Sequence, residues 1–238
     1  MYKRVLLKIS GEALKAESSG ILDSAYLDQV AEIMKRMHDA GTEIAVVIGA
    51  GNIWRGKIAS EIGIDRVPAD FMGMLGTVIN AVAASSSLKK VGVDSIVFSS
   101  VPHIEGVTYA YDKDAANKAL SEGKVVFLSG GTGKPFFTTD TAATMRAIEL
   151  NCDAILMGKN GVTGIYDDDP RKNPNAKFIK DITYDKILEL GLTIMDKSAV
   201  ELIKDTDIHI RVFSMNDLTN FEKVVNGADI GTTCHKGE

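Results

Sequence analysis

Short apolar segments alternate with amphipathic segments along almost the whole of this 238-residue sequence. The apolar segments predict strands at residues 4–9, 44–48, 95–98, 125–128, 154–157 and 208–213. The segments between them repeat apolar residues at helical spacing and predict helices at residues 23–41, 70–88, 112–120, 139–150, 185–190, 197–205 and 217–225. Because strands that are apolar on both faces need cover on both, the pattern predicts a three-layer α/β/α sandwich around an open, mainly parallel sheet.

Length and composition fit one α/β domain of a globular protein. Hydrophobic residues make up 45% and charged residues 25% of the chain, which is ordinary for this class. The sequence has no internal repeat and no linker rich in serine or proline, so we predict a single domain over residues 1–238. Residues 159–178 contain two prolines and three consecutive aspartates, which predicts a surface loop.

Several classes of protein are disfavoured. The net charge of −5 argues against nucleic-acid binding, which usually requires a basic patch. The sequence contains no run of about 18 apolar residues, so no membrane span is predicted. The N-terminal apolar run is too short for a signal peptide. Cys152 and Cys234 lack paired spacing and the four histidines are scattered, so neither a disulfide framework nor a zinc site is predicted. We expect a cytoplasmic protein.

Glycine-rich turns follow four of the predicted strands. The turn at residues 129–140 reads SGGTGKPFFTTD and leads from an apolar strand into a helix. Such a turn can present backbone N–H groups to a phosphate, while its two phenylalanines offer apolar surface to a flat ring. Residues 10–11, 49–51 and 158–161 also follow strands, so the four turns should share the carboxyl edge of the sheet. The sequence therefore predicts a nucleotide site at this edge.

Two common nucleotide-binding motifs are incomplete. Residues 51–57 match the first seven positions of the P-loop, but Ile58 occupies the position of the magnesium-binding Ser or Thr. Trp54 and Phe136 break the two partial dinucleotide-binding fingerprints. Neither standard motif is predicted, although the glycine-rich turns still require an explanation.

Four charged side chains near these turns each allow two interpretations. Lys8 either meets an anion at the end of the first strand or lies in water. Arg55 either binds a phosphate through two hydrogen bonds or is a surface residue. Asp70 is either a helix N-cap or an acceptor for sugar hydroxyls, and Asp140 either caps the next helix or holds Lys8.

The predicted surface loop contains two further candidates. Tyr166 is either a core residue or a stacking surface for a purine. The aspartates at 167–169 form either a solvated acidic turn or a site that holds Mg²⁺ through water.

These motifs occur together in one family. They are residues 8–14 (KISGEAL), 49–56 (GAGNIWRG), Asp70 with 72–74 (MGM), and 131–140 (GTGKPFFTTD), followed by 159–162, Tyr166, 169–170, 195–196 and 211–216. In their order and spacing the chain resembles the bacterial-type UMP kinases of the amino acid kinase superfamily. The resemblance implies an amino acid kinase-like fold and an enzyme that phosphorylates UMP to UDP with ATP in pyrimidine nucleotide biosynthesis.

The resemblance also implies roles for individual residues. For ATP these are Lys8, Ile9, Ser10, Gly11, Gly51, Arg55, Asn160, Tyr166 and Asp169. For UMP they are Ala50, Asp70, Gly131, Thr132, Gly133, Lys134, Pro135, Phe136, Phe137 and Thr138. Lys8, Arg55 and Asp140 would be catalytic, and Mg²⁺ would arrive with ATP without a direct protein ligand. The N-terminal part would hold mainly UMP and the part from about residue 150 mainly ATP.

In-line transfer in such an enzyme needs no general base, because the UMP phosphate is already ionised near neutral pH. The resemblance further implies a homohexamer and inhibition by UTP. The chain departs from the family at Ala50, where glycine is common, and at Lys134, where asparagine is common. Residues 15–20 (KAESSG) are poorer in glycine than the family's loop linked with GTP activation, which leaves GTP only a possible effector.

Three other functions are compatible with parts of the pattern. A kinase of the same superfamily that forms an acyl phosphate would not need the aromatic residues of 135–139. A non-enzymatic nucleotide-binding or storage protein would be expected to lose Lys8, Arg55 and Asp140, which are present. A structural module would leave four converging glycine turns without a purpose.

Overall fold

The computed structural model describes residues 1–15 and 20–237. Nine strands form one sheet in the order β4-β3-β5-β2-β1-β6-β10-β11-β9. The strands are β1 (Arg4–Ile9), β2 (Glu43–Ile48), β3 (Ser95–Ser99), β4 (Tyr109–Ala110), β5 (Val125–Ser129), β6 (Ala154–Lys159), β9 (Asp181–Thr183), β10 (His209–Ser214) and β11 (Thr232–His235). All neighbours pair in parallel except β10 and β11, which run antiparallel. The predicted open, mainly parallel sheet is confirmed.

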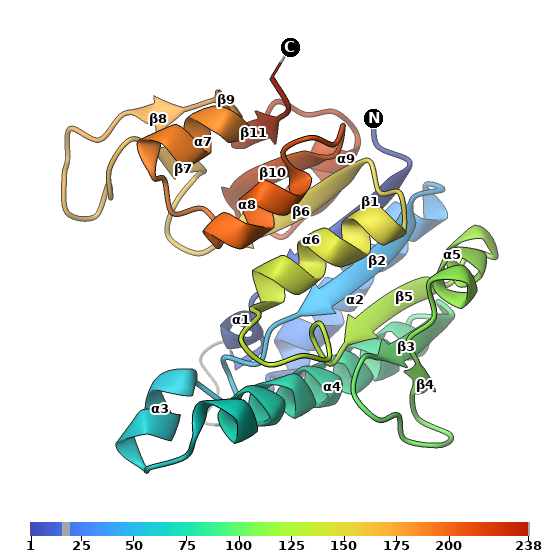
Figure 1. Ribbon diagram of the computed structural model, residues 1–238. Helices are drawn as coiled ribbons and strands as arrows, with labels where there is room; N and C mark the ends of the chain where they lie inside the picture. Colours follow the sequence, from blue (N-terminus) through green and yellow to red (C-terminus); the bar gives the residue numbers. More distant parts are fainter. Residues whose placement is uncertain (16–19, 238) are drawn as a thin grey trace.

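Helices cover both faces of this sheet (Figure 1). One face packs against α1 (Gly11–Lys15), α2 (Ser24–Asp39), α4 (Arg66–Lys90) and α9 (Thr219–Val225). The other packs against α5 (Lys113–Ser121), α6 (Thr139–Glu149), α7 (Tyr184–Leu190) and α8 (Lys197–Ile203). Two separate apolar clusters therefore lie on either side of the sheet, as the three-layer prediction requires.

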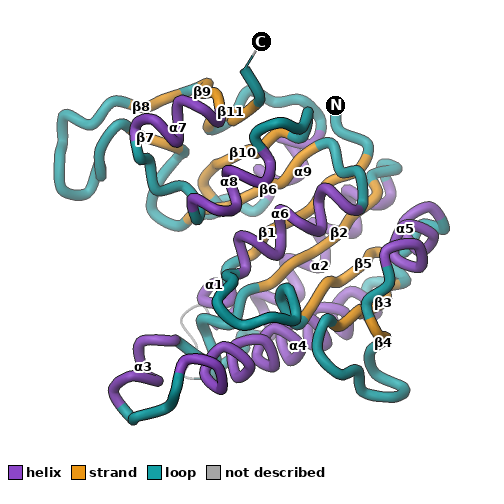
Figure 2. The backbone as a smooth tube through the Cα atoms, in the orientation of Figure 1, coloured by secondary structure: helices purple, strands orange, loops and turns teal. Residues whose placement is uncertain are grey.

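Most of the helices and strands that the sequence pattern did not predict lie in the connections between the predicted ones (Figure 2). The short helix α3 (Gly56–Glu61) precedes α4. The segment predicted as a surface loop contains a small hairpin, β7 (Ile165–Tyr166) with β8 (Phe178–Ile179). Helix α4 begins at Arg66 rather than at residue 70, so the interpretation of Asp70 as an N-cap is wrong.

Helix α4 has the length and apolar composition of a membrane span, the one such helix in residues 1–15 and 20–237. Half of its apolar window is buried inside the molecule, where it packs on the sheet beside α2. It therefore has the environment of a core helix.

Candidate active site

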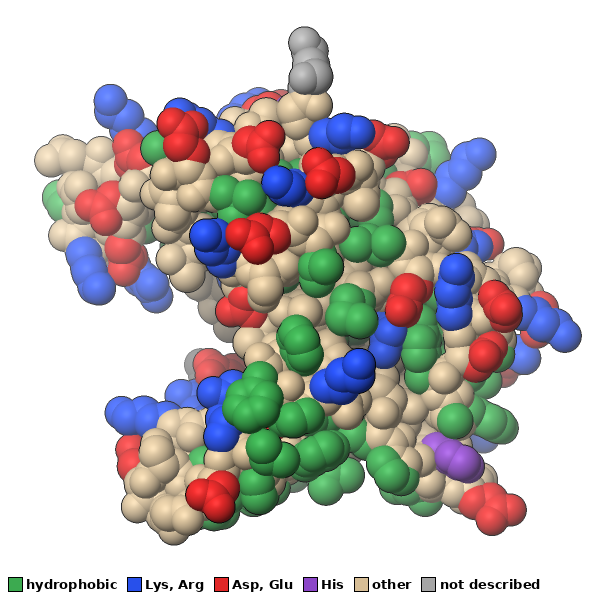
Figure 3. Space-filling model, viewed as in Figure 1, with side chains coloured by type: hydrophobic (Ala, Val, Ile, Leu, Met, Phe, Trp, Pro, Cys, Tyr) green, Lys and Arg blue, Asp and Glu red, His purple; other side chains and the backbone are tan. Residues whose placement is uncertain are grey.

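The glycine turns after β1, β2 and β5 meet at the carboxyl edge of the sheet, as predicted. In the space-filling view, this edge faces a hollow between the β7–β8 region and α3 (Figure 3). The turns after β1 and β2 touch: a Cβ on Gly11 would lie 2.1 Å from the carbonyl oxygen of Gly49. The amide of Asn80, buried on α4, donates to that same carbonyl at 2.7 Å. Glycine at position 11 is therefore a steric requirement of the site.

Lys8 and Asp140 form an ion pair in this edge, with 2.6 Å between Nζ and Oδ1. Lys8 comes from β1, and Asp140 from the first turn of α6. Their side chains are only 16% and 18% exposed, so water screens the pair weakly. Thr138 is the N-cap of α6, because its hydroxyl accepts from the N–H groups of Asp140 and Thr141. Of the two interpretations of Asp140, the structure supports the one in which it holds Lys8.

The loop after β5 has a backbone that strongly favours glycine at several positions. Gly130, Gly131 and Gly133 all have positive φ, and Phe136 adopts φ of 71°. The N–H of Gly130 donates to the Thr77 hydroxyl at 2.8 Å, which ties the loop to α4. A Cβ on Gly133 would lie 2.5 Å from the carbonyl oxygen of Ser100. The loop is thus closely packed on its scaffold at these glycines.

Asp70 lies under the exposed end of this loop. Its carboxylate accepts from the N–H of Phe136 at 2.7 Å and from Nε of Arg66 at 2.8 Å. The Arg66 guanidinium lies 5.7 Å from the centre of the Phe136 ring. Phe136 and Phe137 are 63% and 50% exposed, so both rings offer apolar surface to a ligand. Arg66 was not identified from the sequence, although its spacing of four residues from Asp70 is that of a helical ion pair.

Arg55 is the N-cap residue of α3, the short helix that precedes α4. Its Nη2 contacts Oε1 of Glu12 at 2.9 Å, and its side chain is 60% exposed. A Cβ on Gly51 would come within 2.8 Å of the Glu12 side chain. The structure therefore places Arg55 at the edge with Lys8, and neutralises its charge with a carboxylate.

A second cavity of about 590 Å³ opens beside the end of β6. It is lined by the predicted ATP residues Asn160, Tyr166 and Asp169 and by residues 190–194. The Tyr166 ring packs edge-on against Phe178 at 5.5 Å between centroids. A hydrogen bond from Arg171 is the main cause that lowers the pKa of Asp169. Tyr166 thus lies at a cavity rather than in the core, which supports the stacking interpretation.

Lys159 lines the same cavity and was given no role in the sequence analysis. Its Nζ donates to the carbonyl oxygen of Ile194 at 3.0 Å. Burial, followed by the positive charge of Lys8, lowers the pKa of Lys159, while Asp140 opposes the shift. Lys159 ends β6, which pairs directly with β1, so it lies at the same edge of the sheet as Lys8. A lysine at the carboxyl end of a second central strand was the available signal, since Lys8 lies near the carboxyl end of β1.

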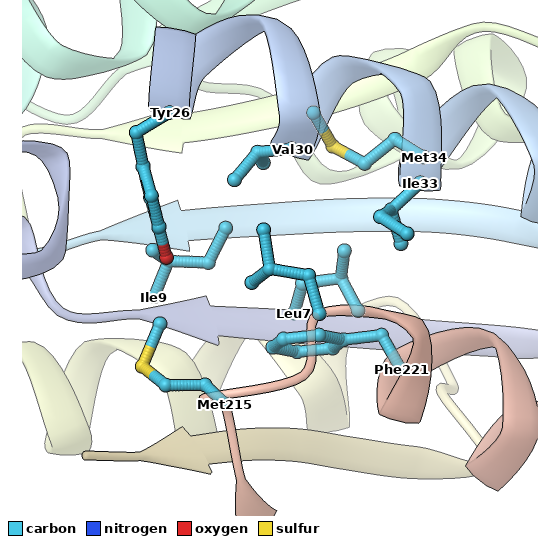
Figure 4. A pocket seen from close by; sticks show the side chains of 9 residues that line it. Leu7, Ile9, Tyr26, Val30, Ile33, Met34, Met215 and Phe221 are labelled. Atoms are coloured by element: carbon cyan, nitrogen blue, oxygen red, sulfur yellow. The ribbon is translucent and has the colours of Figure 1, made fainter. Parts of the chain in front are cut away.

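Ile9 is the predicted site residue whose side chain points away from the edge. It is 3% exposed and packs with residues of α2 and α9 in the apolar cluster on that face (Figure 4). Ile9 lines a small interior pocket whose walls are apolar except for the Tyr26 hydroxyl. Burial raises the pKa of Tyr26 to about 12, so the hydroxyl stays neutral. Ile9 has only its backbone to offer to a ligand.

Comparison with known proteins gives this arrangement a family context. A model of the amino acid kinase family matches residues 3–214. A curated uridylate kinase of Streptococcus thermophilus (strain ATCC BAA-491 / LMD-9) is 45% identical over 98% of this chain and 94% of its own length. The crystal structure of UMP kinase from Bacillus anthracis superposes with a TM-score of 0.95 at 36% identity, covering 100% of this chain and 97% of that one. UMP kinase from Ureaplasma parvum gives a TM-score of 0.91 at 36% identity, covering 99% and 100%.

Proposed function

Because this chain belongs to the amino acid kinase family, with uridylate kinases matching nearly its whole length, we propose that it transfers the terminal phosphoryl group of ATP to UMP and forms UDP. The family inferred from the motifs is confirmed. The observation that carries the proposal is the weakly exposed Lys8–Asp140 ion pair, because it holds an oriented cation at the carboxyl edge of the sheet, where a phosphoryl group in transfer needs positive charge.

UMP binds, in this proposal, on the loop after β5. The N–H-rich backbone of residues 131–138 surrounds the nucleotide, Phe136 and Phe137 cover apolar surface, and Asp70 accepts from the ribose hydroxyls. Ala50 contributes through its backbone, next to the turn that Gly51 makes. Lys134 adds a positive charge on the same loop.

ATP binds in the cavity beside β6. Its base and ribose contact Asn160, Tyr166 and Asp169, and its phosphates extend to Lys8, Ser10 and Gly11 at the end of β1. This division gives the N-terminal part mainly to UMP and the part from about residue 150 mainly to ATP.

Phosphoryl transfer then depends on position and charge. Lys8 and Arg55 stabilise the negative charge on the transferred group, and Asp140 orients Lys8. The UMP phosphate attacks as the anion, so no side chain has to remove a proton. The bond from the γ-phosphorus to the β–γ bridging oxygen breaks as the bond to the UMP phosphate oxygen forms.

Magnesium accompanies ATP in this proposal. The described residues contain no group of three or more His, Cys, Asp or Glu side chains that could hold a metal ion. Mg²⁺ that arrives with ATP would be held mostly by phosphate oxygens and water, as this ion commonly is. The ion would supply charge neutralisation, while the aspartates at 167–169 are the nearest carboxylates along the cavity.

We further propose a homohexamer in the cytoplasm, inhibited by UTP. Helix α4 leaves one apolar stripe exposed, namely Val67, Phe71, Leu75 and Ile79, which are 38–55% exposed. A stripe of this kind on a long helix favours contact with another subunit. Leu75→Glu should dissociate the assembly in light-scattering measurements, while Lys35→Glu on α2 should not.

Residues 16–19, in the loop considered for GTP, lie outside the described residues.

The first experiment measures ADP release with Mg-ATP and UMP, CMP, dUMP or AMP as acceptor. Turnover that is strong with UMP and weak with the other three would support the proposal. Adding UTP or GTP to the same assay tests regulation. Tight ATP binding without turnover on any acceptor would instead favour a nucleotide-binding protein without kinase activity, and turnover with a small carboxylate would favour an acyl-phosphate-forming kinase.

A further inference from the structure

Three cations of the site are each paired with a carboxylate, so these three pairs bring little net charge to two polyanionic substrates. The pairs are Lys8 with Asp140, Arg55 with Glu12, and Arg66 with Asp70. Phosphoryl transfer between ATP and UMP concentrates negative charge on the phosphate oxygens, and catalysis requires positive groups that face it. A cation without a carboxylate partner is therefore of particular interest.

Lys159 is such a cation. It ends β6, the strand that pairs directly with β1. Lys8 lies opposite Met157 in this register, and side chains two residues apart on a strand point to the same face. Lys159 therefore projects from the same face of the sheet as Lys8. This is the face covered by α6, the helix that carries Asp140. Among the described residues, the bonding partner of its Nζ is a carbonyl oxygen, and no carboxylate lies within ion-pair distance.

The position of Lys159 also connects the two halves of the site. It lines the 590 Å³ cavity together with Asn160 and Tyr166, and its strand pairs directly with the strand that carries Lys8. A half-buried ammonium with one carbonyl partner still has two N–H donors to satisfy. Phosphate oxygens at the inner end of the cavity would satisfy them.

We propose that Lys159 is a second catalytic lysine, whose ammonium donates to the phosphate oxygens of bound ATP and stabilises the group in transfer. The inference rests on the proposed function and adds a residue to it. Lys159 keeps its proton throughout the reaction, because the phosphoryl group moves from the β-phosphate oxygen to the UMP phosphate oxygen without proton transfer. Burial, and after it the positive charge of Lys8, lowers the pKa of Lys159 in the free protein, and the negative charge of a bound triphosphate would oppose this shift.

A purely structural role is the alternative, because the bond to Ile194 ties β6 to residues 190–194 of the cavity wall. Lys159→Gln separates the two roles, since an amide N–H can still donate to the carbonyl while the charge is removed. Lys159→Arg keeps the charge. Lys186→Met, which removes an exposed lysine paired with Glu189 on α7, is the matched control.

Calorimetric titration with adenosine, ADP and ATP is the decisive measurement. For Lys159→Gln we expect ADP and ATP affinity to fall by roughly tenfold or more, as for loss of a charge-assisted hydrogen bond, with adenosine affinity unchanged. The turnover number should fall about 10²-fold, and Lys159→Arg should recover part of it. The control should match wild type.

Two results would overturn the proposal. One is equal loss of affinity for adenosine and ADP, which would mean that Lys159 only supports the cavity wall. The other is wild-type ADP and ATP affinity in Lys159→Gln. If Gln prevents folding, the same comparison is made between Lys159→Arg and Lys159→Met. The binding measurements need no acceptor, so their outcome is independent of whether wild-type protein phosphorylates UMP.

Discussion

At the scale of single residues, the site is organised by ion pairs that hold long side chains in place. Lys8 loses rotamer freedom when it pairs with Asp140, so its ammonium is positioned before substrates bind. Arg66 and Asp70 do the same for the exposed end of the loop after β5. Removing a member of either pair should therefore affect different kinetic constants.

Lys8→Met should lower the turnover number by about 10²–10³-fold, the range seen when a group that stabilises transition-state charge is removed. UMP affinity should change little, because Lys8 faces the transferred group. Steady-state kinetics with a separate UMP binding titration measure both quantities. Lys35→Met, which removes an exposed lysine paired with Asp39 on α2, serves as the control. An unchanged turnover number in Lys8→Met would contradict the assigned role.

Asp70→Asn should mainly raise the Michaelis constant for UMP, by roughly ten- to a hundredfold for loss of a hydrogen bond to a charged group. Measuring UMP and dUMP in parallel distinguishes two causes. If Asp70 accepts from the ribose 2′-hydroxyl, the variant loses its preference for UMP over dUMP. Equal weakening of both would mean that Asp70 acts by holding the N–H of Phe136.

Sequence reasoning identified the members of this site better than their contacts. Holding Lys8 was one of the two interpretations of Asp140, and the 2.6 Å contact between them supports it. The Thr138 hydroxyl donates to Asp196, 58 residues further along the chain, and no local pattern indicates such a contact. Lys159 escaped notice because a lysine at a strand end is usually solvated, and only its neighbours show that this one is half-buried.

At the scale of elements, strands were predicted well because buried parallel strands are short continuous apolar runs. Helix α4 begins four residues before its predicted start, and its first turn includes Pro68, where proline is tolerated because the N–H it lacks would have no partner within the helix. β11 has only four residues, TTCH, and becomes a strand through its pairing with β10. Tertiary pairing of this kind leaves no periodic signal in the sequence.

The loop after β5 gives a prediction at this scale. Gly133→Ala should lower the free energy of unfolding by more than Gly106→Ala does. Both glycines have φ near +75°, so both substitutions carry about 1–2 kcal/mol of backbone strain. A Cβ at position 106 meets open space, whereas at 133 it lies 2.5 Å from the Ser100 carbonyl and adds roughly 1–3 kcal/mol. Urea unfolding of the two variants measures the difference, and equal losses would refute the close approach.

At the scale of the whole molecule, the sheet separates the active edge from a titratable cluster at its other end. His209 begins β10, and its Nδ1 lies 2.9 Å from the Tyr2 hydroxyl. Burial chiefly, and then His235 and Arg211, lower the pKa of His209. The folded protein therefore favours the neutral imidazole.

This shift predicts how stability depends on pH. Above about pH 6.5 His209 is neutral in both states; below it, the unfolded chain takes up a proton more readily than the folded one. The free energy of unfolding should therefore fall as the pH drops from about 7.5 to 5.5, and less steeply in His209→Gln. Urea unfolding across this range tests it, with the exposed His103→Gln as control. Parallel slopes for wild type and His209→Gln would contradict the prediction.

The central position of β1 has a consequence for synthesis on the ribosome. β1 pairs with β2 on one side and with β6, about 150 residues later, on the other. At elongation rates of about 5–20 residues per second, one edge of β1 stays unpaired for roughly 8–30 s until β6 has been synthesised. During that time the nascent chain carries an unpaired apolar strand, of the kind that chaperones protect. The strand that carries Lys8 is thus the first to be made, yet it gains its second neighbour only when about two thirds of the chain has been synthesised.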